Sequence, residues 1–229
     1  MKRIWAFLCS AVIVFASVTE ADAADCVIKR VPNEEMKIAL TFDDGPHYKY
    51  TAEILDILKA YDVTATFFVI GSNAAKQPSL IERELAEGHE VENHTFDHVY
   101  LRKLGEDDIR SQVIDSESII AGIADYNTSL IRPPGGLYDD RLPDIASEIG
   151  YKIVLWSIDT CDWEHRSPQR IADNVLSNVK SGDIILMHDF IGKNSPTPAA
   201  LEIILPELIK RGYKFVTVSE LIELGDIDG

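Results

Sequence analysis

The sequence predicts an α/β protein that folds as one domain, a distorted (β/α)7 barrel. Apolar runs rich in β-branched and aromatic residues alternate with longer amphipathic stretches, which is typical of a parallel sheet covered by helices. Several of these runs are apolar enough to be buried on both faces, which favours a barrel over the alternative, an open doubly wound sheet. Glycines follow the helical stretches where a left-handed helix end is expected, at Gly88, Gly150, Gly182 and Gly212.

The expected strands and helices follow one another along the chain. The strands are residues 37–42, 64–70, 90–92, 129–132, 152–157, 183–187 and 214–217, where β-forming residues dominate. Ile54 and Leu58 share one face of the first helix, and Ile109 and Val113 share one face of the third. The predicted helices are residues 51–61, 72–87, 106–124, 139–149, 168–180 and 198–211.

Residues 1–23 are expected to be a secretory signal peptide. Lys2 and Arg3 form a basic start, residues 4–18 are apolar, and Ala23 ends a run of small residues at the usual cleavage spacing. The apolar run is shorter than the ~20 residues that span a bilayer, so cleavage is favoured over a membrane anchor. We therefore expect export to the periplasm, the cell envelope or the medium, with residues 24–229 as the mature domain and no stable membrane insertion after cleavage.

The formal net charge of −16 excludes a general affinity for nucleic acid, which requires a basic surface. It also gives no attraction to anionic lipids, so a neutral or locally basic substrate fits better. We expect a monomer.

Two cysteines, Cys26 and Cys161, remain after export. Both a disulfide between them and two free thiols are open, because a bridge requires a Cα separation that the sequence does not give.

Titratable and aromatic residues follow several of the predicted strands. The carboxyl ends of barrel strands meet at one face, where catalytic groups collect. The residues are Asp43 and Asp44 after the first strand, His94 and His98 after the third, Arg132 at the end of the fourth, residues 159–163 after the fifth and His188 after the sixth. This arrangement predicts a hydrolytic site at one end of the barrel.

The histidines and the carboxylate pair indicate a metal centre. His94 and His98 are spaced i, i+4, so on a helical turn they share a face, and one acid of the pair Asp43–Asp44 can supply a third ligand. Such a set suits zinc or another borderline divalent cation with open positions for hydrolysis. The second carboxylate stays free as a general base, and Arg132 can hold it in its ionised form.

His188 and its surroundings suggest an acid opposite that base. Asp162 can accept the second N–H of His188 and raise its pKa, so that the imidazolium donates a proton to a leaving group. A single histidine at a strand end is more often a core residue whose ring bonds to the backbone. Trp163 fits either a core aromatic or the wall of a sugar site.

The chain resembles the polysaccharide deacetylases, carbohydrate esterase family 4, whose domain the nodulation-factor chitooligosaccharide deacetylases share. The resemblance covers residues 37–224, and it rests on TFDDGP (41–46), HTFDH (94–98), RPPGG (132–136), DTCDW (159–163) and LMH (186–188) in that order. It implies a distorted (β/α)7 barrel and metal-dependent removal of acetyl groups from sugars.

The resemblance also implies roles for individual residues. They are Asp44, His94 and His98 as metal ligands, Asp43 as base, Arg132 as its tether, His188 as acid with Asp162 as its partner, Trp163 and Leu186 as walls around the acetyl methyl, and the Gly135 N–H as an oxyanion donor. The implied cofactor is one divalent ion, with zinc expected and cobalt or nickel compatible with the same ligands.

The chain departs from this family pattern at two positions. The family often has an aromatic residue where Gly135 stands, so that part of the groove wall is missing or supplied by Tyr138. Many members have glycine where Glu92 stands. Neither change removes a catalytic group, and both bear on substrate fit.

The expected activity is the removal of N-acetyl groups from N-acetylglucosamine units of peptidoglycan or chitin-type glycans. An esterase acting on acetylated xylan is the alternative from the same chemistry. A carbohydrate-binding protein with a degenerate site is the alternative from a different class.

Overall fold

The computed structural model describes residues 27–227. The predicted signal peptide and Cys26 lie outside the described residues. None of the helices within them has the length and apolar character that crossing a membrane demands.

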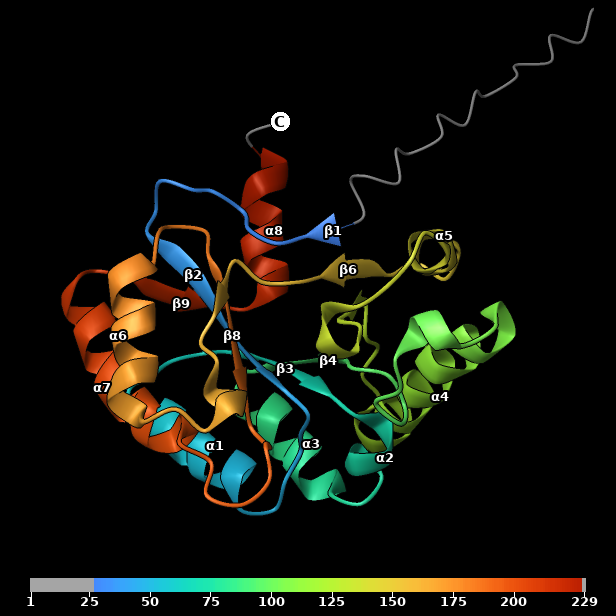
Figure 1. The fold of residues 1–229 in the computed structure, drawn as a ribbon, viewed down its shortest axis with the longest axis horizontal. Coiled ribbons are helices and arrows are strands. Elements are labelled where there is room, and N and C mark those ends of the chain that lie inside the picture. Colours follow the sequence, from blue (N-terminus) through green and yellow to red (C-terminus); the bar gives the residue numbers. More distant parts are fainter. Residues whose placement is uncertain (1–26, 228–229) are drawn as a thin grey trace, which may run out of the picture.

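One sheet of nine strands, all paired in parallel, organises the described residues and forms a half-barrel (Figure 1). The strands are β1 (Val27–Ile28), β2 (Lys37–Asp43), β3 (Thr66–Val69), β4 (Glu90–Asn93), β5 (Leu130–Ile131), β6 (Lys152–Val154), β7 (Ile158–Asp159), β8 (Ile184–His188) and β9 (Lys214–Val216). Their order is β1-β6-β5-β4-β3-β2-β8-β7, and β9 pairs with β2. The predicted fold class, an α/β single domain built as a distorted barrel, is confirmed.

The distortion lies between β6 and β7: the strand predicted at residues 152–157 covers β6 but ends before β7, which was not predicted. Only residues 155–157 separate them, yet β6 pairs with β1 and β5 at one edge of the sheet while β7 pairs with β8 at the other. Leu155 donates its N–H to the Ile28 carbonyl at 2.7 Å, and Ser157 donates to the Ile184 carbonyl at 3.0 Å. This segment therefore crosses the open side of the half-barrel.

The helices pack on both faces of this sheet. They are α1 (Tyr50–Ala60), α2 (Gly71–Ala74), α3 (Pro78–Ala86), α4 (Glu106–Ala124), α5 (Arg141–Glu148), α6 (Pro168–Asn178), α7 (Thr197–Lys210) and α8 (Val218–Ile227). The predicted helix at 72–87 is two helices, because Pro78 starts a new one. The sequence did not predict α8, whose Val218 and Leu221 pack inside the half-barrel against Phe68.

Alternation along β2 separates the two faces of the sheet. Ile38, Leu40 and Phe42 pack in the large cluster formed with α1, α3, α6 and α7. The residues between them, which include Thr41 and Asp43, point into the half-barrel, where a buried arginine contacts both side chains.

The predicted left-handed helix ends are present. Gly88, Gly150, Gly182 and Gly212 have φ values of 85°, 81°, 85° and 90°. At Gly182 a side chain is excluded for a second reason, since an added Cβ would lie 2.0 Å from the Val31 carbonyl oxygen. Glycine there allows the segment that follows β1 to lie against the start of β8.

The parallel register brings the carboxyl ends of the strands together, as predicted. Asp43 at the end of β2 lies opposite His188 at the end of β8. Asn93 at the end of β4 lies opposite Ile131 at the end of β5, directly before the next predicted site residues. Motifs far apart in sequence thus converge on one edge of the sheet.

Candidate active site

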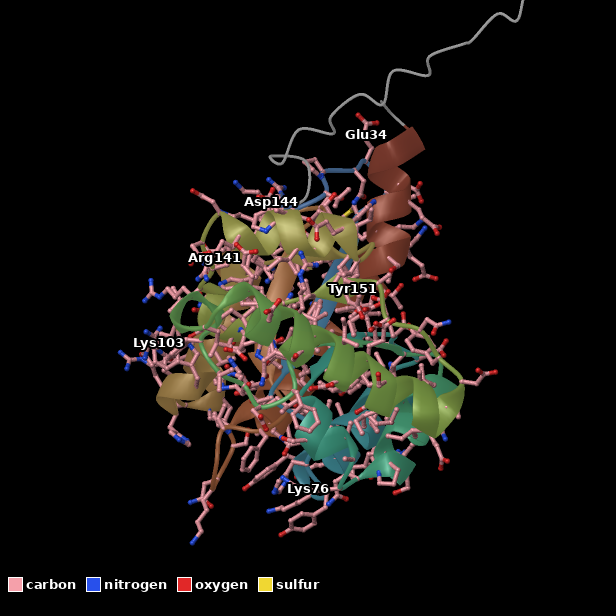
Figure 2. All side chains as sticks on the ribbon, turned by 90° about the vertical axis from the view of Figure 1, so that its right-hand side faces the viewer. Glu34, Lys76, Lys103, Arg141, Asp144 and Tyr151 are labelled. Carbon is pink, nitrogen blue, oxygen red and sulfur yellow. The ribbon has the colours of Figure 1, made fainter. Side chains whose placement is uncertain are left out.

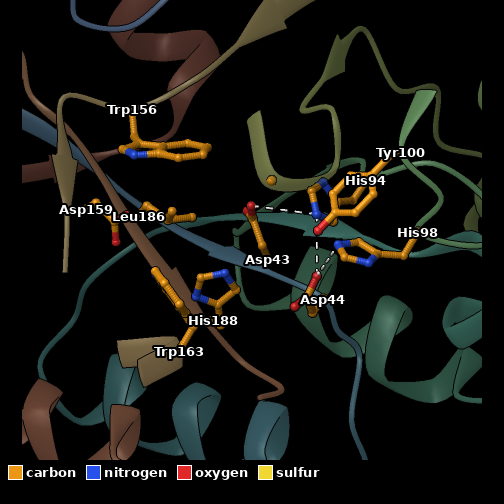
Figure 3. Close-up of a pocket in the computed structure, with 11 residues that line it drawn as sticks. Asp43, Asp44, His94, His98, Tyr100, Trp156, Asp159, Trp163, Leu186 and His188 are labelled. Atoms are coloured by element: carbon orange, nitrogen blue, oxygen red, sulfur yellow. Dashed lines mark ion pairs between the residues drawn. The ribbon is translucent and has the colours of Figure 1, made fainter. Parts of the chain in front are cut away.

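A cavity of about 340 Å³ opens at this edge of the sheet (Figure 3). Its lining residues are Asp43, Asp44, His94, His98, Tyr100, Gly135, Trp156, Asp159, Trp163, Leu186 and His188. It gathers both carboxylates, both histidines of the proposed metal set, and the proposed acid. Arg132 and Asp162, predicted as partners of the base and the acid, lie fully buried behind these residues.

The two adjacent carboxylates reach one cavity because the chain turns at the second of them. Asp43 ends β2 on its inner face, and Asp44 has a φ of 77°, a conformation that non-glycine residues rarely adopt. Asn73 donates its side-chain N–H to the Asp44 carbonyl at 3.0 Å, and Ile70 donates to the Gly45 carbonyl at 3.0 Å. The chain therefore bends at Asp44, directly before Gly45.

A second buried acid supports this turn from behind. The Asp189 N–H donates to the Asp43 carbonyl at 3.1 Å, and its carboxyl group accepts a hydrogen bond from the Thr51 hydroxyl. An added Cβ at Gly45 would lie 1.9 Å from Asp189 Oδ2, so only glycine fits there. Burial raises the pKa of Asp189 to about 7, against the opposing effect of the Thr51 hydrogen bond. The sequence did not predict this contact, because Thr51 and Asp189 are remote in the chain.

The Asp44, His94 and His98 side chains form a compact ligand set. Asp44 Oδ1 lies 3.1 Å from His98 Nε2 and 3.4 Å from His94 Nε2, and the three ligand atoms lie within 4.8 Å of one another. His94 Nδ1 donates to the Arg132 carbonyl at 2.7 Å, and this hydrogen bond orients the ring so that Nε2 faces the carboxylate.

These atoms fit a cation. Asp44 Oδ1 is buried and, apart from the two imidazole nitrogens that face it, has no polar partner among the described residues, an expensive state unless a positive charge completes it. Burial raises the pKa of Asp44, but His94 and His98 outweigh it and hold the pKa well below its usual range. A carboxylate and two imidazoles are the donors that zinc and similar divalent ions prefer.

The histidines do not lie on a helical turn, contrary to the prediction. Residues 94–98 form an irregular loop in which Thr95 and His98 have φ values of 67° and 57°. Asn93 Oδ1 accepts from the Thr95 N–H at 2.8 Å, and Thr95 Oγ1 accepts from the His98 N–H at 3.2 Å. Side-chain hydrogen bonds thus replace helical ones, and the two rings still converge, with centroids 5.0 Å apart.

Arg132 pairs with Asp43 inside the half-barrel. Arg132 Nη1 lies 2.6 Å from Asp43 Oδ1 and donates to Thr41 Oγ1 at 2.8 Å. Its remaining donors bind the Val154 and Leu155 carbonyls at 3.3 and 3.1 Å. Burial lowers the pKa of Arg132, and the ion pair with Asp43 opposes that shift. Asp43 Oδ2 is left facing the ligand set, 3.8 Å from His94 Nε2.

His188 pairs with Asp162 on the other side of the cavity. His188 Nδ1 lies 2.8 Å from Asp162 Oδ1, and the His188 backbone N–H donates to Oδ2 at 2.7 Å. The Thr197 hydroxyl donates to the same oxygen at 2.8 Å. Burial lowers the pKa of His188, but the ion pair with Asp162 outweighs it and raises the pKa to about 9.

Two expectations about the groove are corrected. Tyr138 does not line the cavity; its half-buried side chain packs against the apolar cluster between α4, α5 and β6. Tyr100 lies beside Gly135 instead, and nothing in its sequence context indicated this. Glu92 also lies away from the cavity: it is buried, and Oε2 accepts the backbone N–H groups of residues 129 and 130.

Other expected residues line the cavity together with residues that were not predicted. Leu186 is buried in its wall, and Trp163 is half exposed at its rim. Trp156, not singled out from sequence, lines the cavity from the segment that crosses the open side of the half-barrel. Cys161 is a free thiol within the described residues, and the disulfide with Cys26 stays a prediction because Cys26 lies outside them.

Known proteins resemble this chain over most of its length. A family model described as polysaccharide deacetylase matches residues 30–154. A peptidoglycan-N-acetylglucosamine deacetylase of Bacillus cereus is 43% identical over 205 residues, which cover 89% of this chain and 96% of the relative. The crystal structure of the Bc1960 peptidoglycan N-acetylglucosamine deacetylase matches with a TM-score of 0.83 and 40% identity, over 86% of this chain and 92% of that one.

A family 4 acetyl xylan esterase from Clostridium thermocellum, solved with a cobalt ion, also matches. Its TM-score is 0.77 at 35% identity, over 82% of this chain and 91% of that one.

The His188–Asp162 pair predicts a high pKa that depends on one charge. In metal-free protein, NMR titration of the His188 ring should give a pKa near 9, and Asp162→Asn should lower it by at least about one unit, since a neutral amide cannot stabilise the imidazolium. The charged pair stabilises the fold below the ordinary histidine pKa, and this stabilisation is lost as pH rises through about 9.

The control is Asp173→Asn, which removes an exposed acid on α6. A wild-type His188 that titrates at the ordinary value, or an equal shift in both variants, would contradict this electrostatic account.

Proposed function

The chain belongs to the polysaccharide deacetylase family, and on that premise we propose that it is a metal-dependent hydrolase that removes N-acetyl groups from N-acetylglucosamine residues of a peptidoglycan or chitin-type glycan. One observation carries the proposal: the Asp43 carboxylate, tethered by Arg132, and the His188 imidazole line the same cavity as three side chains that could hold a divalent cation. Base, acid and Lewis acid are the groups that amide hydrolysis requires.

The proposed mechanism assigns each side chain one task. A divalent ion held by Asp44, His94 and His98 would supply Lewis acidity for the acetyl carbonyl and for the attacking water. Asp43 takes the proton of that water, and Arg132 holds its carboxylate in place through the contact with Oδ1. His188 protonates the departing sugar amine, so that acetate and a glucosamine unit leave.

The remaining residues of the proposed site bind the acetyl group. The backbone N–H of Gly135 is proposed to donate to the carbonyl oxygen as negative charge develops on it. Trp163 and Leu186 are proposed to flank the acetyl methyl, for which an apolar wall is suited.

Zinc is the proposed ion, because one carboxylate and two imidazoles are donors that it commonly takes. The same donors accept cobalt or nickel, and the acetyl xylan esterase that resembles this chain was solved with cobalt.

We propose that residues 24–229 act outside the cytoplasm after cleavage at Ala23, as a monomer. Support comes from the basic and apolar start of the sequence and from relatives that are peptidoglycan deacetylases. Such a substrate lies in the cell envelope.

Hydrolysis of acetyl esters is the second candidate function. It is supported by the resemblance of this chain to a family 4 acetyl xylan esterase. The two reactions differ in the leaving group. An amine must be protonated to leave, while an alkoxide leaves with less help. The raised pKa of His188, about 9, keeps the imidazole protonated at neutral pH and therefore favours the amide reaction.

The proposed activity predicts metal-dependent release of acetate. Purified protein should release acetate from peptidoglycan or from chitooligosaccharides, a chelator should abolish this release, and added zinc should restore it, because the ligand set is required for activation of the carbonyl. Acetate is measured enzymatically across a panel that includes acetylxylan. No metal-dependent release from any acetylated glycan would contradict the proposal and favour a carbohydrate-binding protein with an inactive site.

The role of His188 predicts a difference between amide and ester substrates. His188→Ala should reduce kcat on an N-acetylated oligosaccharide by about 10²–10⁴-fold, and on acetylxylan by clearly less, because only the amine requires protonation. Paired kinetics on the zinc-loaded variant measure both. Equal losses on the two substrates would remove the distinction between them.

A further inference from the structure

An exposed aromatic ring borders the cavity on the side of the ligand set. Tyr100 is 44% exposed and lines the cavity two residues after His98. Figure 3 places it beside His94, while Trp163 and His188 lie across the cavity. Trp163 is 50% exposed, so two large aromatic side chains lie on opposite sides of one opening, each with apolar surface in contact with water.

The backbone that follows Tyr100 is held in place by packing and hydrogen bonds. The next residue, Leu101, is only 1% exposed and packs in the apolar cluster with α4 and α5. The Lys103 N–H donates to the Tyr100 carbonyl at 3.0 Å, and Lys103 Nζ lies 5.1 Å from the centroid of the tyrosine ring. Arg141 of α5 donates to the Leu104 carbonyl at 2.7 Å; it projects from the same side of the molecule as Lys103 (Figure 2).

The ring borders space that no side chain of residue 135 occupies. Gly135 has a φ of 63°, and an added Cβ there would lie 3.3 Å from Tyr100 Cε1, closer than ordinary contact. A larger residue at position 135 would have to displace the tyrosine. The Tyr100 ring can therefore take its place beside residue 135 because that residue is glycine.

We propose that Tyr100 is a substrate-specificity residue whose ring packs against the apolar face of a pyranose unit of the glycan. The inference rests on the proposed function, since it concerns the same cavity. With Trp163 it gives the groove two aromatic walls, so that a neutral sugar ring is recognised by apolar contact. Such contact suits a protein with a net charge of −16, which has no general attraction for anionic polymers.

The test is steady-state kinetics of zinc-loaded protein on a chitotetraose. Tyr100→Ala should raise KM about tenfold with kcat within about twofold, because the lost contact contributes to binding and not to chemistry. Tyr100→Phe, which keeps the ring, should stay close to wild type. Hydrolysis of 4-nitrophenyl acetate, which has no sugar, should be unchanged in both variants.

The matched control is Tyr48→Ala, which removes an aromatic side chain that is 69% exposed and does not line the cavity. An unchanged KM in Tyr100→Ala, an equal loss in Tyr100→Phe, or a parallel loss on the aryl acetate would overturn the proposal.

A binding measurement separates this inference from the proposed activity. Calorimetry of chitotetraose with zinc-loaded Asp43→Asn protein, with and without Tyr100→Ala, should show the same tenfold difference in Kd. That difference tests Tyr100 even if wild-type protein releases no acetate from any glycan; equal Kd values would overturn the inference alone.

Discussion

The buried ion pair between Arg132 and Asp43 is the constraint on which the rest of the site depends. The guanidinium has no exposed surface and binds groups from two places: the Asp43 carboxylate and Thr41 hydroxyl on β2, and the Val154 and Leu155 carbonyls at the gap in the half-barrel. A buried ion pair often adds little net stability, while loss of one partner costs about 3–5 kcal/mol. Its main effect here is geometric, since it fixes one carboxylate oxygen and leaves the other facing the cavity.

The same constraint gives two neighbouring acids different surroundings. Along a regular strand, Asp43 and Asp44 would face opposite sides of the sheet. The turn at Asp44, with a φ of 77°, brings its carboxylate to the histidines, while Asp43 stays on the inner face with Arg132. Two carboxyl groups of one site can serve different roles when their surroundings differ. In some hydrolases, for example, an apolar pocket raises the pKa of one carboxyl group while the other stays ionised.

Periodic features of the sequence predicted the architecture. The sequence did not predict contacts between side chains that are distant in the chain. Strand and helix alternation placed Asp43 and His188 at one edge, because that depends only on parallel pairing. The gap between β6 and β7 depends on pairing with strands distant in the chain, so residues 152–157 were predicted as one strand. Tyr100 lines the cavity and Tyr138, which was expected there, does not, since the packing of loops decides which tyrosine reaches the cavity.

The division of roles between the two acids is tested most directly by measuring zinc affinity and acetate release in Asp43→Asn and Asp44→Asn. The account predicts that Asp43→Asn binds zinc within about threefold of wild type while its rate falls by about 10²-fold or more, and that Asp44→Asn weakens zinc binding by at least about 100-fold. Equal loss of zinc in both variants, or a normal rate in zinc-loaded Asp43→Asn, would contradict it.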